Sequence, residues 1–351
     1  MNDHLISIPR MATLDREMGL RAEQRQRSLT KPPGSLGRLE RLAVTLAMQQ
    51  RRERPRVDRV QCVLFAADHG VCAEGVSAFP QAVTGQMVAN FAGGGAAISV
   101  LSRHLDAALS VINVGTIEPL PALPGVQDAR VGPGTGNIAR EPAMTRDQLA
   151  RSLAAGDAAA ESAADNAAEL VIGGEMGIGN TTAAAALACA LTGALPTDLV
   201  GRGTGVDDAG MARKRAAVRL ALERHGEGRE PLDALASLGG FEIAALAGLM
   251  LGCGQRGIAI LVDGFIASTA ALAAVRAAPD LRPWLHFAHR SAEAGHRHVL
   301  GSLEAEPLLN LEMRLGEGSG AAVAVPLLRM ACALHDEMAS FSDAGVDHGS
   351  P

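Results

Sequence analysis

The chain has 351 residues, of which 48% are apolar and 20% charged, so it can bury a large core in one big domain or two modest ones. Its formal net charge of −6 leaves no basic surplus, which argues against nucleic acid as a partner. Aromatic residues are scarce and tyrosine is absent, which also argues against a stacking surface for single strands.

The five cysteines are spread along the chain and form no Cys-x-x-Cys pair, as is typical of buried thiols in a reducing cytosol. The chain does not open with a basic segment followed by an apolar stretch. The apolar segment from Ile258 to Val275 is interrupted by Asp263 and Ser268 and falls short of a spanning helix. We therefore expect a cytoplasmic protein that does not bind a membrane.

The two ends of the chain are predicted to be helical. Residues 10–54 and 319–340 show a helical pattern, and neither segment contains a predicted strand. We expect these ends to pack together, which divides the chain into a large α/β domain at 57–318 and a small helical domain made of 1–56 with 319–351.

Between these ends, short β-branched runs alternate with longer Ala- and Leu-rich stretches. The predicted strands are Val60 to Ala66, Leu109 to Val114, Leu170 to Ile172 and Ile258 to Val262. The predicted helices lie at about 80–104, 145–166, 181–192, 207–225, 240–252 and 264–278. This alternation predicts a parallel sheet with helices on both faces, in which ligands bind beyond the carboxyl ends of the strands.

The glycine-rich segment from Gly173 to Thr182 follows a predicted strand and precedes an Ala-rich helix. Free backbone N–H groups and the positive end of the helix dipole favour an anion at such a junction. The spacing is that of a Walker A loop, but Asn180 stands where that loop has lysine, so a monophosphate is a better ligand than a triphosphate. A tight turn without a ligand explains the spacing equally well.

Two more glycine-rich loops could lie near the first. Gly201 to Gly205 precedes a helix that carries Lys214, which could supply the missing cation if the two loops converge, although such a lysine is more often solvated. Gly132 to Asn137 belongs to a long Pro- and Gly-rich linker at 116–142, and we favour a structural role for this loop.

Glu317 stands between two glycines, directly ahead of an apolar run that ends near Met330. The glycines let a ligand approach and the run favours a buried helix, so the carboxylate would be partly desolvated. Desolvation raises the pKa of a carboxyl toward the range of a general base. An acid that complements the dipole of the following helix is the simpler alternative.

Two further acids, Asp68 and Asp263, follow predicted strands and could hold sugar hydroxyls, offset positive charge or cap a helix. The histidines between 286 and 298 lack the usual spacing of zinc ligands on one helical face. We expect neither a metal ion nor a cofactor.

Five segments of the chain match one family when taken together. They are Leu29-Thr30-Lys31-Pro32-Pro33-Gly34-Ser35-Leu36-Gly37-Arg38-Leu39-Glu40, Ala67-Asp68-His69-Gly70, Gly174-Glu175-Met176-Gly177-Ile178-Gly179-Asn180-Thr181-Thr182, Val262-Asp263-Gly264-Phe265 and Arg314-Leu315-Gly316-Glu317-Gly318-Ser319-Gly320. In sequence and in order they resemble the nicotinate-nucleotide–dimethylbenzimidazole phosphoribosyltransferase family. The resemblance runs from about Leu29 to His335.

The resemblance implies transfer of the phosphoribosyl group of nicotinate mononucleotide to 5,6-dimethylbenzimidazole. The products would be nicotinate and α-ribazole 5′-phosphate, a precursor of the lower ligand of cobalamin. It also implies a Rossmann-like large domain, a small helical domain from both chain ends, and a homodimer whose partner subunit helps to close the site.

By the same resemblance, Glu317 is the general base. The residues implied at the phosphoribosyl group are Glu175, Gly177, Ile178, Gly179, Asn180, Gly203, Lys214, Asp263 and Ser291. Those implied at the acceptor base are Phe79, Pro80, Met87 and Leu315. Family members vary at the position of Phe79, and plain core packing remains an alternative for Phe79 and Met87.

The implied reaction suits these residues. Nicotinate leaves a cationic pyridinium as a neutral ring and needs no proton, whereas the attacking benzimidazole becomes cationic and must lose a proton to Glu317. A single displacement would invert the anomeric carbon from β to α. Carboxylates such as Glu175 and Asp263 would stabilise an oxocarbenium-like transition state.

Two other classes of function are compatible with parts of the sequence. A noncatalytic nucleotide-binding or regulatory protein could use the same phosphate loop, and it would bind nicotinate mononucleotide without releasing nicotinate. A P-loop NTPase is disfavoured because Asn180 replaces the lysine that such enzymes use.

Overall fold

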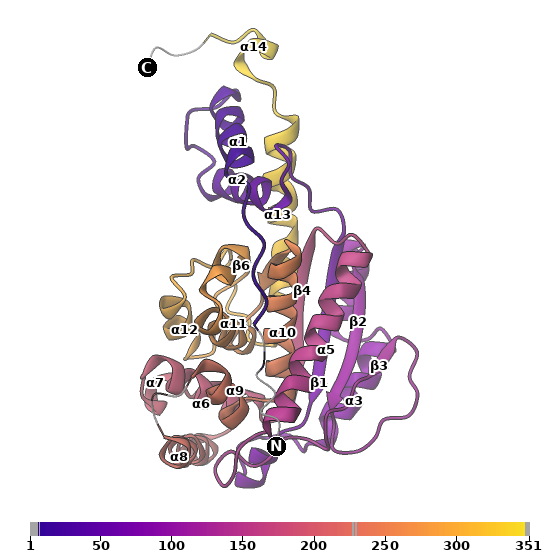
Figure 1. Cartoon of the computed structure of the whole chain (residues 1–351), viewed down its shortest axis with the longest axis vertical. Coiled ribbons are helices and arrows are strands. Elements are labelled where there is room, and N and C mark those ends of the chain that lie inside the picture. Colours follow the sequence, from indigo (N-terminus) through magenta and orange to yellow (C-terminus); the bar gives the residue numbers. More distant parts are fainter. Residues whose placement is uncertain (1–5, 7, 227, 229, 348–351) are drawn as a thin grey trace.

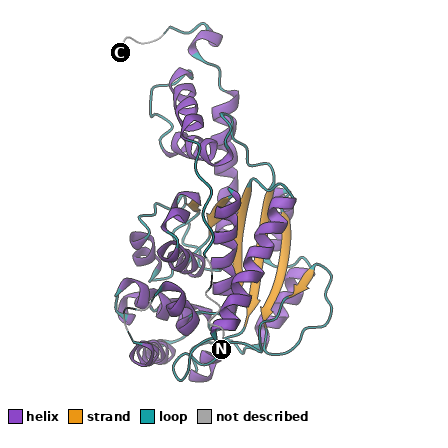
Figure 2. Cartoon of the chain, in the orientation of Figure 1, coloured by secondary structure: helices purple, strands orange, loops and turns teal. Residues whose placement is uncertain are grey.

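The computed structural model describes residues 6, 8–226, 228 and 230–347. A helical lobe stands at one end of a larger body in which helices surround a β-sheet (Figures 1 and 2). The strands are β1 (Val60–Ala67), β2 (Ala108–Gly115), β3 (Val126–Asp128), β4 (Leu170–Met176), β5 (Ala259–Val262) and β6 (Leu285–Phe287). All neighbouring strands are parallel, in the order β3-β2-β1-β4-β5-β6. This is the order of a Rossmann-like sheet, so the predicted fold class is confirmed.

Strand β1 is buried along its whole length because helices cover both faces of the sheet. Val63 and Phe65 point into one apolar core, and Cys62 and Leu64 point into the other. The helices of the first core include α5 (Arg146–Asp165), α6 (Asn180–Thr192), α10 (Phe241–Arg256) and α11 (Phe265–Ala277). Those of the second include α3 (Ala82–Ala92), α4 (Ala97–Leu105) and α13 (Ser319–Glu337). A continuous apolar run is what such a doubly covered strand requires.

The helical lobe consists of α1 (Arg16–Ser28), α2 (Arg38–Gln50) and the second half of α13. The side chain of Gln26 in α1 lies 2.8 Å from Nδ1 of His335 in α13, so these two helices are in contact. Helix α13 runs from the body, beside β4, to the lobe (Figure 1). It therefore connects the segment around Glu317 to the lobe.

Several expected elements differ in detail. The stretch at 80–104 forms two helices, α3 and α4, because the glycines at 93–95 separate them. The short strands β3 and β6 were not predicted, and β3 lies inside the linker at 116–142. Strand β4 continues to Met176, so Gly173 and Gly174 lie in the strand rather than in the loop that was predicted there.

Glycines occur inside β4 because other segments approach its backbone. An added Cβ at Gly173 would lie 2.6 Å from the Leu246 side chain, and one at Gly174 would lie 2.4 Å from the carbonyl oxygen of Glu317. Both distances are shorter than any van der Waals contact. The glycines in this strand thus permit the close packing of α10 and of the Glu317 turn.

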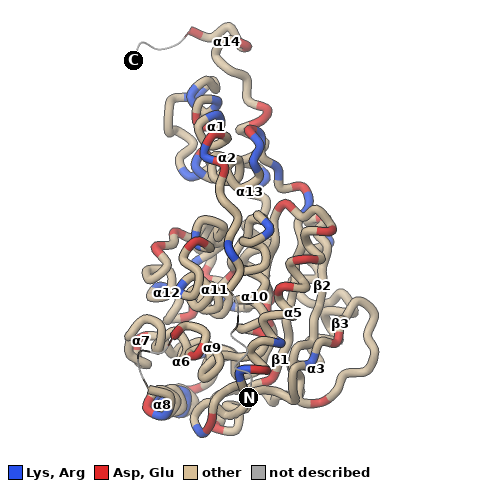
Figure 3. Tube along the Cα trace, viewed as in Figure 1, with Lys and Arg blue, Asp and Glu red and all other residues tan. Residues whose placement is uncertain are grey.

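The remaining helical elements are η1 (Gly70–Glu74), α7 (Pro196–Leu199), α8 (Asp208–His225), α9 (Pro231–Leu238), η2 (Pro279–Trp284), α12 (His296–Ser302) and α14 (Phe341–Ala344). Within the described part of the chain, every helix is too short or too polar to cross a membrane. Basic and acidic residues are interspersed along the trace (Figure 3).

Candidate active site

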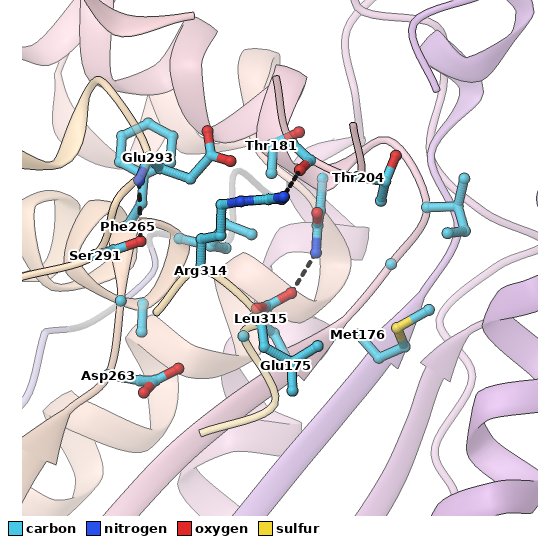
Figure 4. Close-up of a pocket in the computed structure, with 18 of the residues that line it drawn as sticks. Glu175, Met176, Thr181, Thr204, Asp263, Phe265, Ser291, Glu293, Arg314 and Leu315 are labelled. Atoms are coloured by element: carbon cyan, nitrogen blue, oxygen red, sulfur yellow. Dashed lines mark hydrogen bonds between the residues drawn. The ribbon is translucent and has the colours of Figure 1, made fainter. Parts of the chain in front are cut away.

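A cavity of about 310 Å³ opens beyond the carboxyl ends of β4 and β5, next to the point where the strand order reverses. Ligands bind in this region in open parallel sheets. Its wall combines the β4–α6 loop, the segment that follows β5, the loop around Gly203 and the residues ahead of α13 (Figure 4).

Most of the residues predicted for the site lie in this wall. They are Phe79, Glu175, Gly177, Ile178, Asn180, Gly203, Asp263, Ser291 and Leu315. The predicted residues outside the wall are Pro80, Met87, Gly179, Lys214 and Glu317. Three of these, Gly179, Lys214 and Glu317, lie directly behind it, as their contacts show.

Glu317 lies in a tight turn between Gly316, which lines the cavity, and Gly318, the N-cap of α13. Its backbone is left-handed, with φ of 64°, an uncommon conformation for a residue with a side chain. The side chain is only 5% exposed, and its Oε2 lies 3.4 Å from the backbone nitrogen of Ile98 at the start of α4. Burial, and then the charge of Asp263, raises the pKa of Glu317 above its ordinary value. The carboxyl is thus a better proton acceptor than an exposed glutamate.

Glu175, the penultimate residue of β4, is a second buried carboxyl in the site. Its Oε2 accepts a hydrogen bond from the Asn180 side chain, and its Oε1 is so close to Gly316 that an added Cβ there would clash. Burial raises the pKa of Glu175 well above its ordinary value, and the charges of Glu242, Asp263 and Glu317 raise it further. The two glutamates therefore pack into one acidic region.

The β4–α6 loop offers fewer free donors than the sequence suggested. The backbone N–H of Ile178 donates to Thr84 Oγ1, and those of Asn180 and Thr182 donate to backbone carbonyls in the same turn. Gly179, the left-handed N-cap of α6, packs against Cys72. An anion bound here would depend on groups from other segments as well.

One such group is Lys214 on α8, which is 1% exposed. Its Nζ donates to Thr181 Oγ1 and to the carbonyl oxygen of Gly201, both at 2.9 Å. An added Cβ at Gly203 would lie 3.0 Å from the same Nζ. Burial lowers the pKa of Lys214 to about 8, against the opposing effect of Glu293. The first and second glycine loops therefore converge on this amine, as the sequence allowed.

The apolar part of the wall includes Phe79 and Leu315, which are 50% and 59% exposed. Pro80 is exposed next to Phe79 but does not line the cavity. Met87 packs instead against the second apolar core, so the alternative of core packing describes it better.

The Ala67-Asp68-His69-Gly70 segment lies behind the cavity. His69 and Glu242 are fully buried, and His69 Nε2 lies 2.6 Å from Glu242 Oε1. An added Cβ at Gly177 would lie 3.2 Å from the same ring nitrogen. The Asp68 carboxylate accepts the backbone N–H of Ile117, so it stabilises the loop after β2.

Some wall residues were not predicted to be in the site. They include Thr181, His289, Glu293 and Arg314. Arg314 donates to the carbonyl oxygen of Gly203 at 2.8 Å and so ties the Glu317 segment to the second loop. In Figure 4, Glu175 and Asp263 lie on one side of the cavity, whereas Thr181, Glu293 and Arg314 lie on the other. Thr181 and Arg314 had a sequence signal, because each belongs to one of the five matching segments, whereas His289 and Glu293 belong to none of them.

The chain is similar to known proteins over almost its whole length. A family model described as phosphoribosyltransferase matches residues 11–346. The nicotinate-nucleotide–dimethylbenzimidazole phosphoribosyltransferase of Ectopseudomonas mendocina is 61% identical over 334 residues, which cover 95% of each chain. The Pseudomonas aeruginosa protein of the same name is 58% identical over 333 residues, again 95% of each chain. A crystal structure of the Thermus thermophilus enzyme of that name matches with a TM-score of 0.91 at 47% identity, covering 96% of this chain and 100% of the other.

Proposed function

Because this chain belongs to the nicotinate-nucleotide–dimethylbenzimidazole phosphoribosyltransferase family, we propose that the cavity beside Glu317 holds both substrates and that Glu317 is the general base. The enzyme transfers the phosphoribosyl group of nicotinate mononucleotide to 5,6-dimethylbenzimidazole. It thereby acts in the lower-ligand branch of cobalamin synthesis. A noncatalytic nucleotide-binding role is not needed to explain the site.

The reaction exchanges one nitrogen for another at the anomeric carbon. The bond between that carbon and the pyridinium nitrogen breaks, and its electron pair leaves with nicotinate, whose ring becomes neutral. One nitrogen of dimethylbenzimidazole forms the new bond from the opposite face, which inverts the anomeric carbon from β to α. The second nitrogen of the acceptor then carries the surplus proton and must release it.

Glu317 accepts this proton in our proposal. The observation that carries the assignment is a buried carboxyl with a raised pKa, located in a turn whose neighbours Leu315 and Gly316 line the cavity. Glu175 and Asp263 lie in the wall near it and would stabilise positive charge that develops on the ribose.

The phosphate of the nucleotide binds near Gly203 in this proposal. Lys214 supplies a buried positive charge behind Gly203, and Ser291 lines the same cavity. Gly177, Ile178, Gly179 and Asn180 shape the adjacent turn. Because several N–H groups of that turn are already paired, the phosphate depends more on Lys214 than a loop of the Walker type would.

Dimethylbenzimidazole binds next to Phe79 and Leu315 in our proposal. Both side chains are about half exposed at the cavity, although they are large and apolar. A homodimer whose second subunit covers them would remove this surface from water. We further propose that residues 57–318 form the catalytic domain, that 1–56 with 319–351 form the helical domain, and that the enzyme works in the cytoplasm.

The Glu317→Gln variant tests the base. It keeps the size and a hydrogen-bond acceptor but cannot take up a proton, so kcat should fall about 10²–10⁴-fold. Calorimetric binding of nicotinate mononucleotide should be unchanged. In the wild type, kcat should decrease as the pH falls through the raised pKa of Glu317, because a protonated base is inactive, and the variant should lack this limb.

The matched control is Glu312→Gln, an exposed acid five positions earlier that does not line the cavity. It should retain wild-type kcat. Full turnover by Glu317→Gln would refute the assignment of the base, whereas nucleotide binding without any release of nicotinate by the wild type would favour the noncatalytic alternative.

A further inference from the structure

Helix α13 begins directly after the Glu317 turn but has no cap of its own. Its N-cap residue, Gly318, has no side chain that could accept a hydrogen bond from the first turn. The acceptor comes from the end of β5, where Asp263 Oδ1 lies 2.8 Å from the backbone nitrogen of Ala321. A carboxylate in this place satisfies a free N–H group and complements the helix dipole. Asp263 therefore caps α13 from a distant segment of the chain.

His289, just beyond β6, packs against both Asp263 and the first turn of α13. Its Nε2 lies 3.5 Å from Asp263 Oδ1. An added Cβ at Gly320, in the first turn of α13, would lie 2.3 Å from the same nitrogen, so only glycine leaves room for the ring. The ring is 3% exposed, and its Nδ1 has no hydrogen-bond partner among the described residues. We call Asp263, His289 and Gly320 the α13 anchor.

The Glu317 turn needs such an anchor. Gly316, Glu317 and Gly318 all have left-handed backbones, with φ of 88°, 64° and 80°. A non-glycine residue in this conformation costs about 1–3 kcal/mol and persists only where the surrounding structure fixes it. The start of α13 is the segment that follows the turn directly, so its position determines where the Glu317 carboxylate points.

We propose that His289 is a positioning residue, which holds Asp263 on the first turn of α13 and thereby fixes the carboxylate of Glu317 at the reacting base. This inference rests on the proposed role of Glu317. It gives Asp263 a structural task in addition to its place in the cavity wall. His289 also lines the cavity, but in this proposal it acts through Asp263 and not through contact with the nucleotide or the acceptor.

Two substitutions of His289 separate positioning from general packing. The amide nitrogen of glutamine reaches about as far as Nε2 of histidine, whereas that of asparagine is too short to meet Asp263. We expect His289→Asn to lower kcat about 10–100-fold, since displacing a catalytic group by about 1 Å has effects of this size. The KM for nicotinate mononucleotide should stay the same, and His289→Gln should retain most of the activity.

The matched control is His286→Asn. His286 lies in β6, is also buried, and hydrogen-bonds to Gln49 of the helical lobe at 2.9 Å, outside the cavity wall. Its loss should lower the thermal midpoint without lowering kcat. A double-mutant cycle with Asp263→Asn completes the test, because a residue that acts through Asp263 adds no further loss once that carboxylate is gone.

The inference is overturned if His289→Asn raises KM with unchanged kcat, which would make His289 a substrate contact. It is also overturned if asparagine and glutamine reduce kcat equally, or if the losses in the cycle add. If His289→Asn does not fold, two measurements on His289→Gln test whether His289 acts through Asp263. They are its kcat relative to wild type and the double-mutant cycle of His289→Gln with Asp263→Asn. An active Glu317→Gln would remove the proposed base itself, whereas an inactive Glu317→Gln with a normal His289→Asn would remove only the anchor.

Discussion

The chain has only two lysines, Lys31 and Lys214, and both are buried. Lys31 forms an ion pair with Glu40 in the helical lobe at 2.9 Å. Among the residues that the structure describes, the hydrogen-bond acceptors of Lys214 are both neutral: the Thr181 hydroxyl and the carbonyl of Gly201. Replacing each lysine with methionine, which is similar in length but uncharged, should therefore change stability in opposite directions.

For Lys214→Met, the size of the change in stability follows from the pKa of Lys214. Burial lowers it from 10.5 to about 8, which at about 1.4 kcal/mol per pKa unit corresponds to roughly 3 kcal/mol of destabilisation by the charged amine. Methionine removes this cost but leaves the Gly201 carbonyl without its donor, which costs about 1–3 kcal/mol. We expect Lys214→Met to stabilise the free enzyme by up to about 2 kcal/mol at pH 7.

The pH dependence has a definite sign. Because the folded-state pKa lies below the unfolded value, the unfolded chain binds more protons between about pH 8 and 10.5, and the stability contributed by this site rises with pH in that window. The advantage of Lys214→Met, measured by urea unfolding, should therefore be full at pH 7 and shrink toward pH 10. Lys31→Met should instead lower stability by about 3 kcal/mol, since it leaves the acid of a largely buried pair without its partner.

Lys214→Met should weaken nucleotide binding although it stabilises the free enzyme. A hydrogen bond from a charged donor contributes about 1.5–3 kcal/mol, so Lys214→Met should weaken calorimetric binding of nicotinate mononucleotide about 10–100-fold. Wild-type binding should also weaken above about pH 8 as Lys214 loses its proton. Lys31→Met should bind the nucleotide normally. The reasoning is refuted if Lys214→Met is less stable than wild type, or if its effect on stability does not change with pH.

Three other substitutions test the rest of the site. The folded-state pKa of Glu175 is raised, so ionisation of this carboxyl destabilises the folded enzyme as the pH rises from about 4.5. Glu175→Gln should therefore raise the thermal midpoint at pH 7 but not at pH 4. An equal rise in the midpoint at both pH values would contradict the raised pKa. Gly174→Ala should nearly abolish kcat, because its Cβ would displace the backbone of Glu317, and a crystal structure with that turn unmoved would count against this account. Phe79→Ala should raise the KM for dimethylbenzimidazole and leave nucleotide affinity unchanged, whereas equal kinetics for both substrates would exclude Phe79 from the acceptor site.

The central part of the fold could be predicted from the sequence because its strands are buried on both faces. Strand β1 is a nearly continuous apolar run and β4 begins with one, Leu170 to Ile172, which is a pattern that local sequence reveals. Strand β3 has no such pattern, since its three residues are at most partly buried and only pairing with β2 makes them a strand. The sequence predicted a loop at Gly173 and Gly174. Glycine is needed there because Glu317 and Leu246, from distant segments of the chain, approach the strand closely.

The same limit applies to the site. Glu317 and Glu175 stand out in the sequence because glycines flank them or lie close by. The role of His289 has no such local signal, because it depends on the distance between the ends of β5 and β6 and the start of α13. Sequence patterns identify residues that face a ligand more readily than those that hold such residues in place.

The distribution of charge in the cavity suits the substrate and also its departure. Glu175, Asp263 and Glu317 gather where β4 and β5 end, whereas Lys214 and Arg314 gather around Gly203 together with a single acid, Glu293. Nicotinate mononucleotide has the complementary arrangement, with a cationic ring at one end and a phosphate at the other. Once the glycosidic bond breaks, the ring is neutral and nicotinate retains only its negative carboxylate. With the site assigned as we propose, the acids would attract the incoming ring and repel the product, so a single charge arrangement would favour both nucleotide binding and nicotinate release.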